Sequence, residues 1–263
     1  MSDARRAPEG VDTSKPNSAR VYDYLLGGKD NYEVDRQVAN RMLLVAPDTR
    51  ITAWFSRQFL IQAVQTAAAA GVRQFIDLGA GIPTTPAVHE VAQKIDADAR
   101  IAAVDYDPVV YAHSNALLAG IPGVTPILAD IRDIDELIGR LRSEAAVDFD
   151  RPVAVMLCGV LHFIMDDERP DEIIARLAEV MAPGSYLALT QGSTDSTEAF
   201  TSQARRDLTD SPSRFVFRSA AQTAALLDGF EILAPGIVPL QNWLDGELPA
   251  TDLVIFGGIC RKP

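Results

Sequence analysis

Short apolar runs alternate with helix-length segments between residues 73 and 190, and this alternation restricts the chain to very few folds. Five runs have the length and apolar character of buried strands, namely 73–78, 100–105, 124–130, 152–158 and 185–190. An amphipathic segment long enough for a helix follows each of the first four. Parallel strands need crossover connections of this kind, so the pattern predicts an α/β fold with a parallel sheet covered by helices on both faces.

The C-terminal part of the chain departs from this alternation. The strand-like runs 230–236 and 251–260 have no helix-length segment between them. Two neighbouring strands with a short connection pair most readily as antiparallel partners, which predicts an antiparallel edge to the sheet. Trp243 lies between the two runs, where it either closes the region of a ligand site or fills the edge of the sheet.

The residues ahead of the first strand have a different texture. Residues 1–17 contain almost no large apolar side chains, so we expect a disordered tail. Helical spacing of apolar residues, with glycine or proline after each segment, predicts helices over 18–26, 32–46 and 48–70, the first with Ser18 as its N-cap. The chain is thus expected to divide into an N-terminal helical segment, 18–70, and a core, 71–263.

Charge and cysteine content exclude several classes of function. The chain has 263 residues, and 24 Lys and Arg against 36 Asp and Glu give a net charge of -12, which argues against a nucleic-acid partner. The two cysteines, Cys158 and Cys260, lack the spacing of a metal site. No apolar run has the length of a membrane span or a signal-peptide core, so we expect a cytoplasmic protein without a membrane partner.

A glycine turn follows the first predicted strand, in the stretch "FIDLGAGIPT" of residues 75–84. Gly79 and Gly81 allow a close approach of the backbone to a ligand, and the next helix offers free N–H groups at its start. An isolated Gly-x-Gly is more often an ordinary tight turn between a strand and a helix. The turn alone therefore does not identify a site.

Two acidic residues at the ends of the next strands make a ligand site the better interpretation. Asp105 closes the second strand, where a carboxylate can accept hydrogen bonds from both ribose hydroxyls. Asp130 closes the third, where it can accept from an adenine amino group while Ile131 packs on the ring. Because the carboxyl ends of parallel strands meet at one edge, these residues predict an adenosine-binding site.

The same stretch favours one adenosine ligand over another. A dinucleotide fingerprint needs a third glycine, and Thr84 stands in its place. Asp77, two residues before Gly79, would repel a pyrophosphate but can meet the amino group of a methionine moiety. S-adenosylmethionine therefore fits the pattern better than NAD.

The motifs "FIDLGAGIPT", "AAVDYDP", "ILADIRD" and "VAVMLCGVLHFI" resemble those of class I S-adenosylmethionine-dependent methyltransferases. More narrowly, "ARVYDYLLGGKDNYEVDR" together with "DLGAGIPT" and "VDYDPVV" resembles the actinobacterial S-adenosyl methyltransferase family that was long catalogued as a domain of unknown function. This resemblance implies a Rossmann-like fold with a seven-stranded, mostly parallel sheet and one antiparallel strand. It also implies S-adenosyl-L-methionine as cofactor and S-adenosyl-L-homocysteine as product. Pro83 replaces the third glycine of the wider class.

The resemblance implies cofactor binding by Gly79, Gly81, Asp105 and Asp130. The expected cofactor site also takes in their neighbours and the loop after the fourth strand: Asp77, Ala80, Tyr106, Ile131, Cys158 and Gly159. His162 is the candidate catalytic base, and its alternatives are a wall of the methionine pocket or a packing histidine. No metal ligand is expected.

Segments ahead of the first strand commonly fold across the cofactor in such enzymes, so residues 18–70 are expected to act as a lid. Tyr22, Lys29, Asn31 and Tyr32 are the candidate lid residues, whose rings would exclude water and whose polar groups would meet the methionine carboxylate. The polar stretch 190–207 is either a loop and helix near the acceptor or a solvated connector.

These observations predict a methyltransferase that acts on a small-molecule acceptor. The stretch "CGVLHFIMDD" after the fourth strand differs from Asn-Pro-Pro-Tyr, the form associated with methylation of bases and glutamine. Two alternatives stay open: a non-catalytic or regulatory protein that binds S-adenosylmethionine, since no general base stands out, and an NAD-dependent oxidoreductase. The acceptor atom and the oligomeric state are left open by the sequence.

Overall fold

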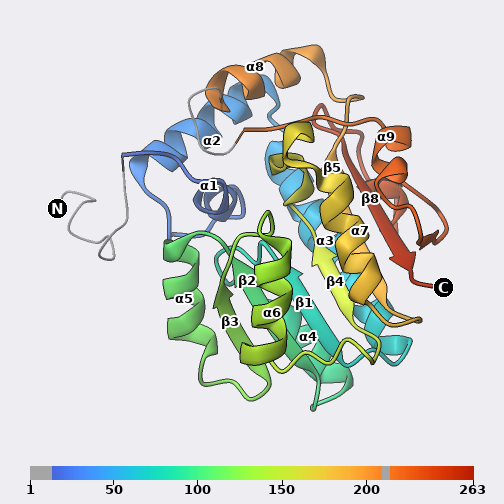
Figure 1. Ribbon diagram of the computed structural model, residues 1–263. Coiled ribbons are helices and arrows are strands. Elements are labelled where there is room, and N and C mark those ends of the chain that lie inside the picture. Colours follow the sequence, from blue (N-terminus) through green and yellow to red (C-terminus); the bar gives the residue numbers. More distant parts are fainter. Residues whose placement is uncertain (1–13, 209–213) are drawn as a thin grey trace.

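The computed structural model describes residues 14–208 and 214–263, which form one twisted sheet with helices on both faces (Figure 1). Residues 1–13, which hold most of the expected disordered tail, lie outside the described residues. Within the described residues, the eight strands are β1 (Gln74–Leu78), β2 (Arg100–Asp105), β3 (Val124–Leu128), β4 (Ala154–Leu157), β5 (Tyr186–Gly192), β6 (Glu231–Ile232), β7 (Val238–Pro239) and β8 (Ile255–Arg261).

The strand order is β3-β2-β1-β4-β5-β8-β6, with β7 paired to β8 beside this path. Strands β1 to β5 are parallel to one another, and β8 runs antiparallel to its neighbour β5. The predicted mostly parallel sheet with one antiparallel strand is therefore confirmed. The chain order reverses between β1 and β4, and ligands of such sheets bind at this point, outside the carboxyl ends of the strands.

The described residues contain one strand more than the expected seven, because a further short strand, β7, follows the run 230–236. The run contributes only β6, and β7 begins after a turn in which Gly236 N donates to Leu233 O at 2.9 Å. Pro235 has no N–H group for a ladder, which breaks the run at this point. Both short strands pair antiparallel with β8, which thus has two partners on its outer edge.

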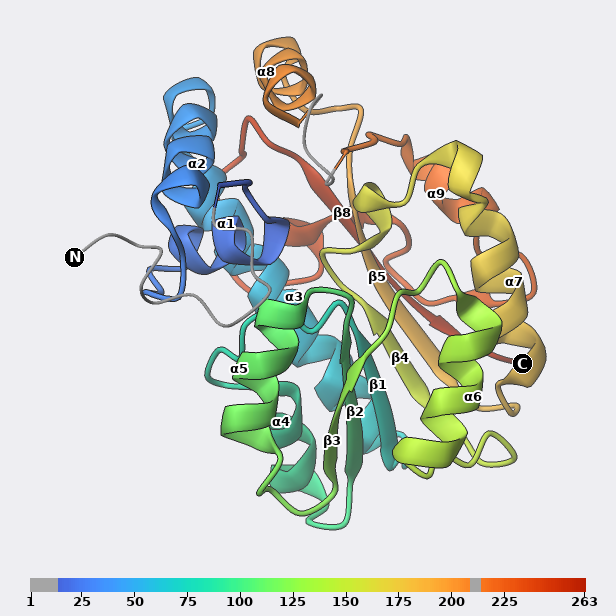
Figure 2. The same ribbon diagram turned by 60° about the vertical axis from the view of Figure 1, so that its left-hand side comes forward.

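The helices are α1 (Ser18–Leu25), α2 (Glu33–Val45), α3 (Thr49–Ala69), α4 (Val88–Ile95), α5 (Pro108–Leu118), α6 (Ile134–Glu144), α7 (Pro170–Val180), α8 (Glu198–Leu208) and α9 (Ala220–Ala225). Helices α3, α4 and α5 cover one face of the sheet, and α6 and α7 cover the other (Figure 2). Side chains along each strand alternate between the two faces: Phe75 packs in the cluster with α3, and Ile76 in the cluster with α6 and α7.

The first helix begins one residue earlier than expected, because Asn17 is its N-cap in place of Ser18. The Asn17 side chain accepts hydrogen bonds from the backbone N–H groups of Ala19 and Arg20 at 2.8 and 3.2 Å. The Arg20 guanidinium donates to the carbonyl of Lys15 at 2.7 Å. Lys15 and Asn17, expected in the tail, are thus part of the folded structure.

Helix α3 belongs to the core, although it lies in the segment expected to form a lid. Phe55, Phe59 and Ala63, which recur at helical spacing, are buried in the cluster that packs against the sheet. Only α1 and α2 of the expected lid lie over the carboxyl ends of the strands, together with α8 (Figure 1). The ring of Trp243 meets Phe59 edge-on at 5.7 Å, and its N–H donates to Gly257 O on β8, so it fills the sheet edge.

Candidate functional site

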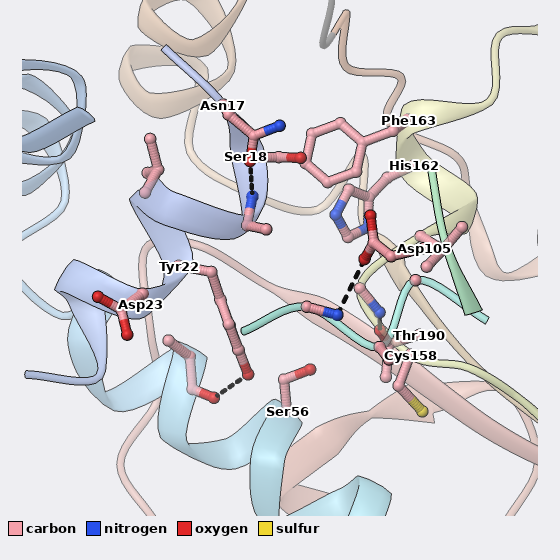
Figure 3. Close-up of a pocket in the computed structure, with 18 of the residues that line it drawn as sticks. Asn17, Ser18, Tyr22, Asp23, Ser56, Asp105, Cys158, His162, Phe163 and Thr190 are labelled. Carbon is pink, nitrogen blue, oxygen red and sulfur yellow. Dashed lines mark hydrogen bonds between the residues drawn. The ribbon is translucent and has the colours of Figure 1, made fainter. Parts of the chain in front are cut away.

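A cavity of about 230 Å³ lies at the carboxyl ends of the parallel strands, beneath α1 and α2. Its walls come from α1, α2 and α3, from the loops after β1 to β4, and from β5, α8 and β8. Figure 3 shows side chains of α1, α3 and β5, of the end of β2 and of the loop after β4 around the same space. Within the described ranges, no group of three or more His, Cys, Asp or Glu could hold a metal ion.

The glycine turn after β1 forms part of the cavity floor. Gly79 N and Ala80 N both donate to Val104 O on β2, at 2.8 and 2.9 Å, and Gly81 N donates to Asp105 Oδ2 at 2.9 Å. Gly79 has φ of +69°, and a Cβ on it would lie 2.2 Å from Val160 Cγ2. Only glycine fits here, because the loop after β4 presses directly on the turn.

Two buried carboxyl groups stand beside this turn. Asp105 is 7% exposed, and besides Gly81 its carboxylate accepts from Asp107 N at 3.0 Å. Burial raises the pKa of Asp105 to about 6, although these backbone hydrogen bonds act in the opposite direction. Burial also raises the pKa of Asp77 to about 6, against the opposing effect of the Arg57 guanidinium. Both carboxyl groups therefore change charge near pH 6.

Arg57 on α3 is a site residue that the sequence reasoning missed. One of its terminal nitrogens donates to the carbonyls of Thr84 and Pro86, which follow the glycine turn. Its buried Nε has no hydrogen-bond partner among the described residues. The sequence does contain a signal for it: Arg57 shares a helical face with Ala53 and Leu60, which also line the cavity.

The outer end of the expected cofactor site is more exposed. Asp130 Oδ1 accepts from the backbone N–H and from the Nε of Arg132, at 2.9 and 3.1 Å. The Arg132 guanidinium lies 5.7 Å from the ring centroid of Tyr106, which is 40% exposed. Asp130, Ile131 and Tyr106 all line the cavity. This end thus combines an acceptor group with apolar surface.

The loop after β4 contributes neutral groups to the middle of the cavity. Gly159 N donates to the Thr190 hydroxyl on β5 at 2.7 Å, which ties the loop to the next strand. Burial, and then the charge of Asp77, raise the pKa of the Cys158 thiol, so the thiol stays protonated. Cys158, Gly159 and Thr190 line the cavity.

His162 lies in a short 3₁₀ turn, Leu161–Phe163, and also lines the cavity. Its ring is 7% exposed and stacks on Phe215, with ring centroids 4.4 Å apart and planes at 28°. Burial, assisted by the charge of Arg218, lowers the pKa of His162 to about 3. The imidazole is therefore neutral at physiological pH, and Nδ1 has no hydrogen-bond partner in the described structure.

Of the four expected lid residues, the structure brings only Tyr22 to the cavity. Its hydroxyl donates to Ala53 O at 2.9 Å, and burial raises the pKa of Tyr22 to about 12. Within the described chain, Lys29, Asn31 and Tyr32 are not among the cavity-lining residues. Lys29 is exposed at the surface.

Asn31 and Tyr32 are placed elsewhere because they serve the N-terminal fold itself. Asn31 Nδ2 donates to Asp23 Oδ2 at 2.8 Å, and the ring of Tyr32 faces the Arg20 guanidinium at 5.1 Å. The structure does not bring these side chains to the cavity, and their expected contact with the methionine carboxylate stays a prediction.

The comparison with protein families decides the identity of this site. The model of a family described as S-adenosyl methyltransferase matches residues 4–263. The chain belongs to the S-adenosyl methyltransferase family. This confirms the resemblance seen in the motifs, and the enzyme is an S-adenosylmethionine-dependent methyltransferase.

Solved structures agree with this assignment. A candidate methyltransferase from Thermobifida fusca is 37% identical, with 97% of this chain and 98% of that chain covered and a TM-score of 0.89. A DUF574 family protein from Streptomyces avermitilis is 32% identical, with 96% and 99% covered and a TM-score of 0.89. No curated protein matches the chain.

A more distant structure shows the fold alone. The N-methyltransferase NodS from Bradyrhizobium japonicum, in complex with S-adenosyl-L-homocysteine, is 15% identical to the methyltransferase, with 94% and 99% covered and a TM-score of 0.52. The class I fold expected from the sequence is thereby confirmed.

The chemistry of the cavity fits the family's cofactor. S-adenosylmethionine carries a ribose, an adenine and a methionine zwitterion, and the methyltransferase offers buried carboxyl groups beside the glycine turn and an arginine with an unpartnered nitrogen. Sequence reasoning missed Arg57, Phe163, Phe200 and Phe215 in this lining. The three phenylalanines carried no signal, because isolated aromatic residues are ordinary in a core.

Proposed function

We propose that this methyltransferase transfers the methyl group of S-adenosylmethionine to a small-molecule acceptor held in the cavity under α1 and α2. The observation that carries this proposal is the enclosure of the cavity, since the strand ends form its floor and α1, α2 and Phe200 of α8 form its roof. A space closed on these sides suits a small molecule better than a segment of a macromolecule. The net charge of -12 gives nucleic acid no favourable field.

The proposed cofactor contacts follow from the charge of each group. Asp105 accepts from the ribose hydroxyls, and Asp130 accepts from the adenine amino group beside Ile131. Asp77 meets the methionine ammonium group, and Arg57 meets the carboxylate, a role that the sequence had suggested for Lys29. The charge of Arg57 acts on the pKa of Asp77, so the two groups lie near one another. This supports the proposed contacts, because the methionine zwitterion needs one protein group of each charge.

When bound, S-adenosylmethionine supplies a methyl carbon that the acceptor's lone pair attacks, while the electron pair of the broken C–S bond stays on sulfur. The chain's own residues align the acceptor and keep water out of the cavity. Tyr22 and Cys158 both stay protonated, since burial raises the pKa of each, so neither competes as a nucleophile. A proton that the acceptor loses passes to bulk water when the methylated product leaves the cavity.

Labelling tests the acceptor class directly. The enzyme is incubated with S-adenosylmethionine labelled in its methyl group and a cell extract, and the mixture is separated by ultrafiltration. The expected result is an enzyme-dependent labelled compound in the low-molecular-mass filtrate that chromatography separates from S-adenosylmethionine. Label confined to proteins or nucleic acids in the retained fraction would contradict the proposal, and heat-inactivated enzyme is the control.

We also propose a cytoplasmic location, supported by Cys158 and Cys260, which are both free thiols. In the part of the chain that the structure describes, no helix has the length and apolar character needed to span a membrane. The location can be checked by fractionating cells and detecting the enzyme with an antibody.

A further inference from the structure

The cavity extends beyond the groups proposed to hold the cofactor. This second part, the apolar compartment, is lined by Val38 and Met42 of α2, Leu60 of α3, Phe200 of α8, Leu253 ahead of β8, and Ile255, the first residue of β8. Phe200 is 2% exposed and Val38 is 3% exposed. None of these six side chains carries a charge, so this compartment offers an ionic group no partner.

Hydroxyl groups of α3 that line the same cavity are already used by the protein. The Thr49 hydroxyl donates to Ala46 O at 2.7 Å, and the Thr52 hydroxyl donates at 3.3 Å to Asp48 O or Leu253 O. These donors are satisfied by the backbone. The part of the α3 wall at Thr49 and Thr52 therefore offers a ligand no free hydroxyl donor, in contrast to Arg57 further along the helix.

His162 differs from these groups because its Nδ1 has no partner in the described structure. The imidazole lies among aromatic rings: it stacks on Phe215 at 4.4 Å, and Phe163 meets Phe215 edge-on at 5.4 Å. All three rings line the cavity, and Figure 3 shows His162 and Phe163 side by side at its wall. An unpartnered buried ring nitrogen in such a cluster calls for a polar group from a ligand.

Building on the proposed function, we propose that the acceptor is an uncharged, ring-bearing molecule that fills the apolar compartment and places a hydroxyl or amine group against His162. The flat rings of the cluster favour a flat ligand, since aromatic pairs stack or meet edge to face. A charged tail would lose its hydration in the compartment without gaining a partner. The neutral imidazole accepts the hydrogen bond, and its lowered pKa makes it a poor holder of a full proton.

Four related probes test whether the compartment prefers an uncharged ligand, on protein saturated with S-adenosylhomocysteine. They are 4-ethylphenol, its anionic analogue 4-hydroxyphenylacetate, its cationic analogue tyramine, and 4-ethylanisole, which lacks the donor. Calorimetry should show 4-ethylphenol binding at least tenfold more tightly than either charged phenol. Equal or tighter binding of a charged phenol would overturn the proposal. So would the absence of 4-ethylphenol binding at roughly 5 mM.

The variant His162→Phe tests the hydrogen bond while keeping a ring that can stack on Phe215. In the wild-type protein 4-ethylphenol should bind about tenfold more tightly than 4-ethylanisole, as one hydrogen bond in a buried site provides. In the variant this preference should disappear. A preference that persists in the variant would exclude His162 as the partner.

A charge placed in the compartment gives a complementary test. Phe200→Lys should weaken 4-ethylphenol at least tenfold and reverse its advantage over 4-hydroxyphenylacetate, whereas Leu44→Lys, at a site 83% exposed on α2, should leave both unchanged. An unchanged probe order in Phe200→Lys would count against the compartment. Titration with S-adenosylhomocysteine separates the two proposals. If S-adenosylhomocysteine does not bind, the proposed function is contradicted. If it binds and the probes do not, only the proposed acceptor class is contradicted.

Discussion

Two glycine turns of similar composition serve different parts of this enzyme. The turn after β1 contains Gly79 and Gly81, forms part of the cavity floor and is held by Asp105, which accepts from Gly81 N. The turn between α1 and α2 contains Gly28, where a Cβ would lie 1.9 Å from Asp23 Oδ1. Both turns need glycine for close packing, so a glycine-rich polar stretch indicates close contact and does not by itself indicate a ligand.

The difference lies in which residues of each turn reach the cavity. Asp23 accepts from Asp30 N at 2.9 Å and from the Asn31 side chain at 2.8 Å, and Asp105 accepts from two backbone N–H groups, so both carboxylates are held in place while both line the cavity. Gly79 and Gly81 line it too, whereas within the described chain Gly28 and Lys29 are not among the lining residues. The N-terminal turn is thus a scaffold for the roof, and the turn after β1 is a surface for a ligand.

The largest expected effect concerns the scaffold. Asp35 is fully buried and accepts from Arg20 Nε at 2.9 Å and from the backbone N–H groups of Asn17 and Tyr32. Asp35→Ala leaves the buried Arg20 guanidinium without its ion-pair partner, so the free energy of unfolding should fall by about 3 to 5 kcal/mol. Denaturant titration measures the loss.

A matched control lies on the same helix. The exposed pair between Glu33 and Arg36, at 2.9 Å, should contribute less than about 1 kcal/mol, so Glu33→Ala should have little effect on stability. Similar losses for Asp35→Ala and Glu33→Ala would contradict the assignment of Asp35 as the centre of the scaffold.

The next effect separates the cavity from the N-terminal turn. Arg57→Met should weaken S-adenosylmethionine binding by about 2 kcal/mol, or roughly thirtyfold, because it removes a charge-assisted hydrogen bond to the methionine carboxylate. Lys29→Met should leave the affinity unchanged, since Lys29 is exposed and outside the cavity lining. Calorimetry on both variants decides between them, and a loss in Lys29→Met alone would restore the lid interpretation of the turn.

The sequence predicted the parts of the site that follow from topology. Asp105 and Asp130 could be placed together because the ends of successive parallel strands meet at one edge. Arg57 and Phe200 could not, because their approach depends on how α3 and α8 pack across the sheet. The direction of a side chain on a turn, such as Lys29, is likewise set by neighbours that the pattern does not contain.

The two carboxyl groups of the cavity also predict a pH effect on cofactor binding. Asp77 and Asp105 have pKa values raised to about 6, and both must be ionised to accept from the cofactor. As the pH is raised from 5 toward 6, the S-adenosylmethionine affinity should therefore increase by up to about tenfold per group for each pH unit. Above pH 7 the affinity should level off. Calorimetry between pH 5 and pH 8 measures this, and a flat profile would exclude ionised carboxylates from binding.

The stability of the ligand-free enzyme should depend on pH in the opposite direction to cofactor binding. A carboxyl group whose pKa is higher in the folded than in the unfolded state stabilises the fold most below its unfolded pKa, near 4. This contribution is lost as the pH rises through about 6. Asp77→Asn should reduce the pH dependence of both binding and stability, because it removes one of the two titrating groups from each.

The smallest expected effect concerns Tyr22, which belongs to both regions because it lies on α1 and lines the cavity. Tyr22→Phe removes the hydrogen bond from its hydroxyl to Ala53 O and keeps the ring. The free energy of unfolding should fall by about 1 kcal/mol, and the S-adenosylmethionine affinity should change less than about threefold. Denaturant titration and calorimetry on the same variant check both values. A large loss of affinity with unchanged stability would mean that the hydroxyl turns to the cofactor, and that α1 takes part in binding as well as in covering the cavity.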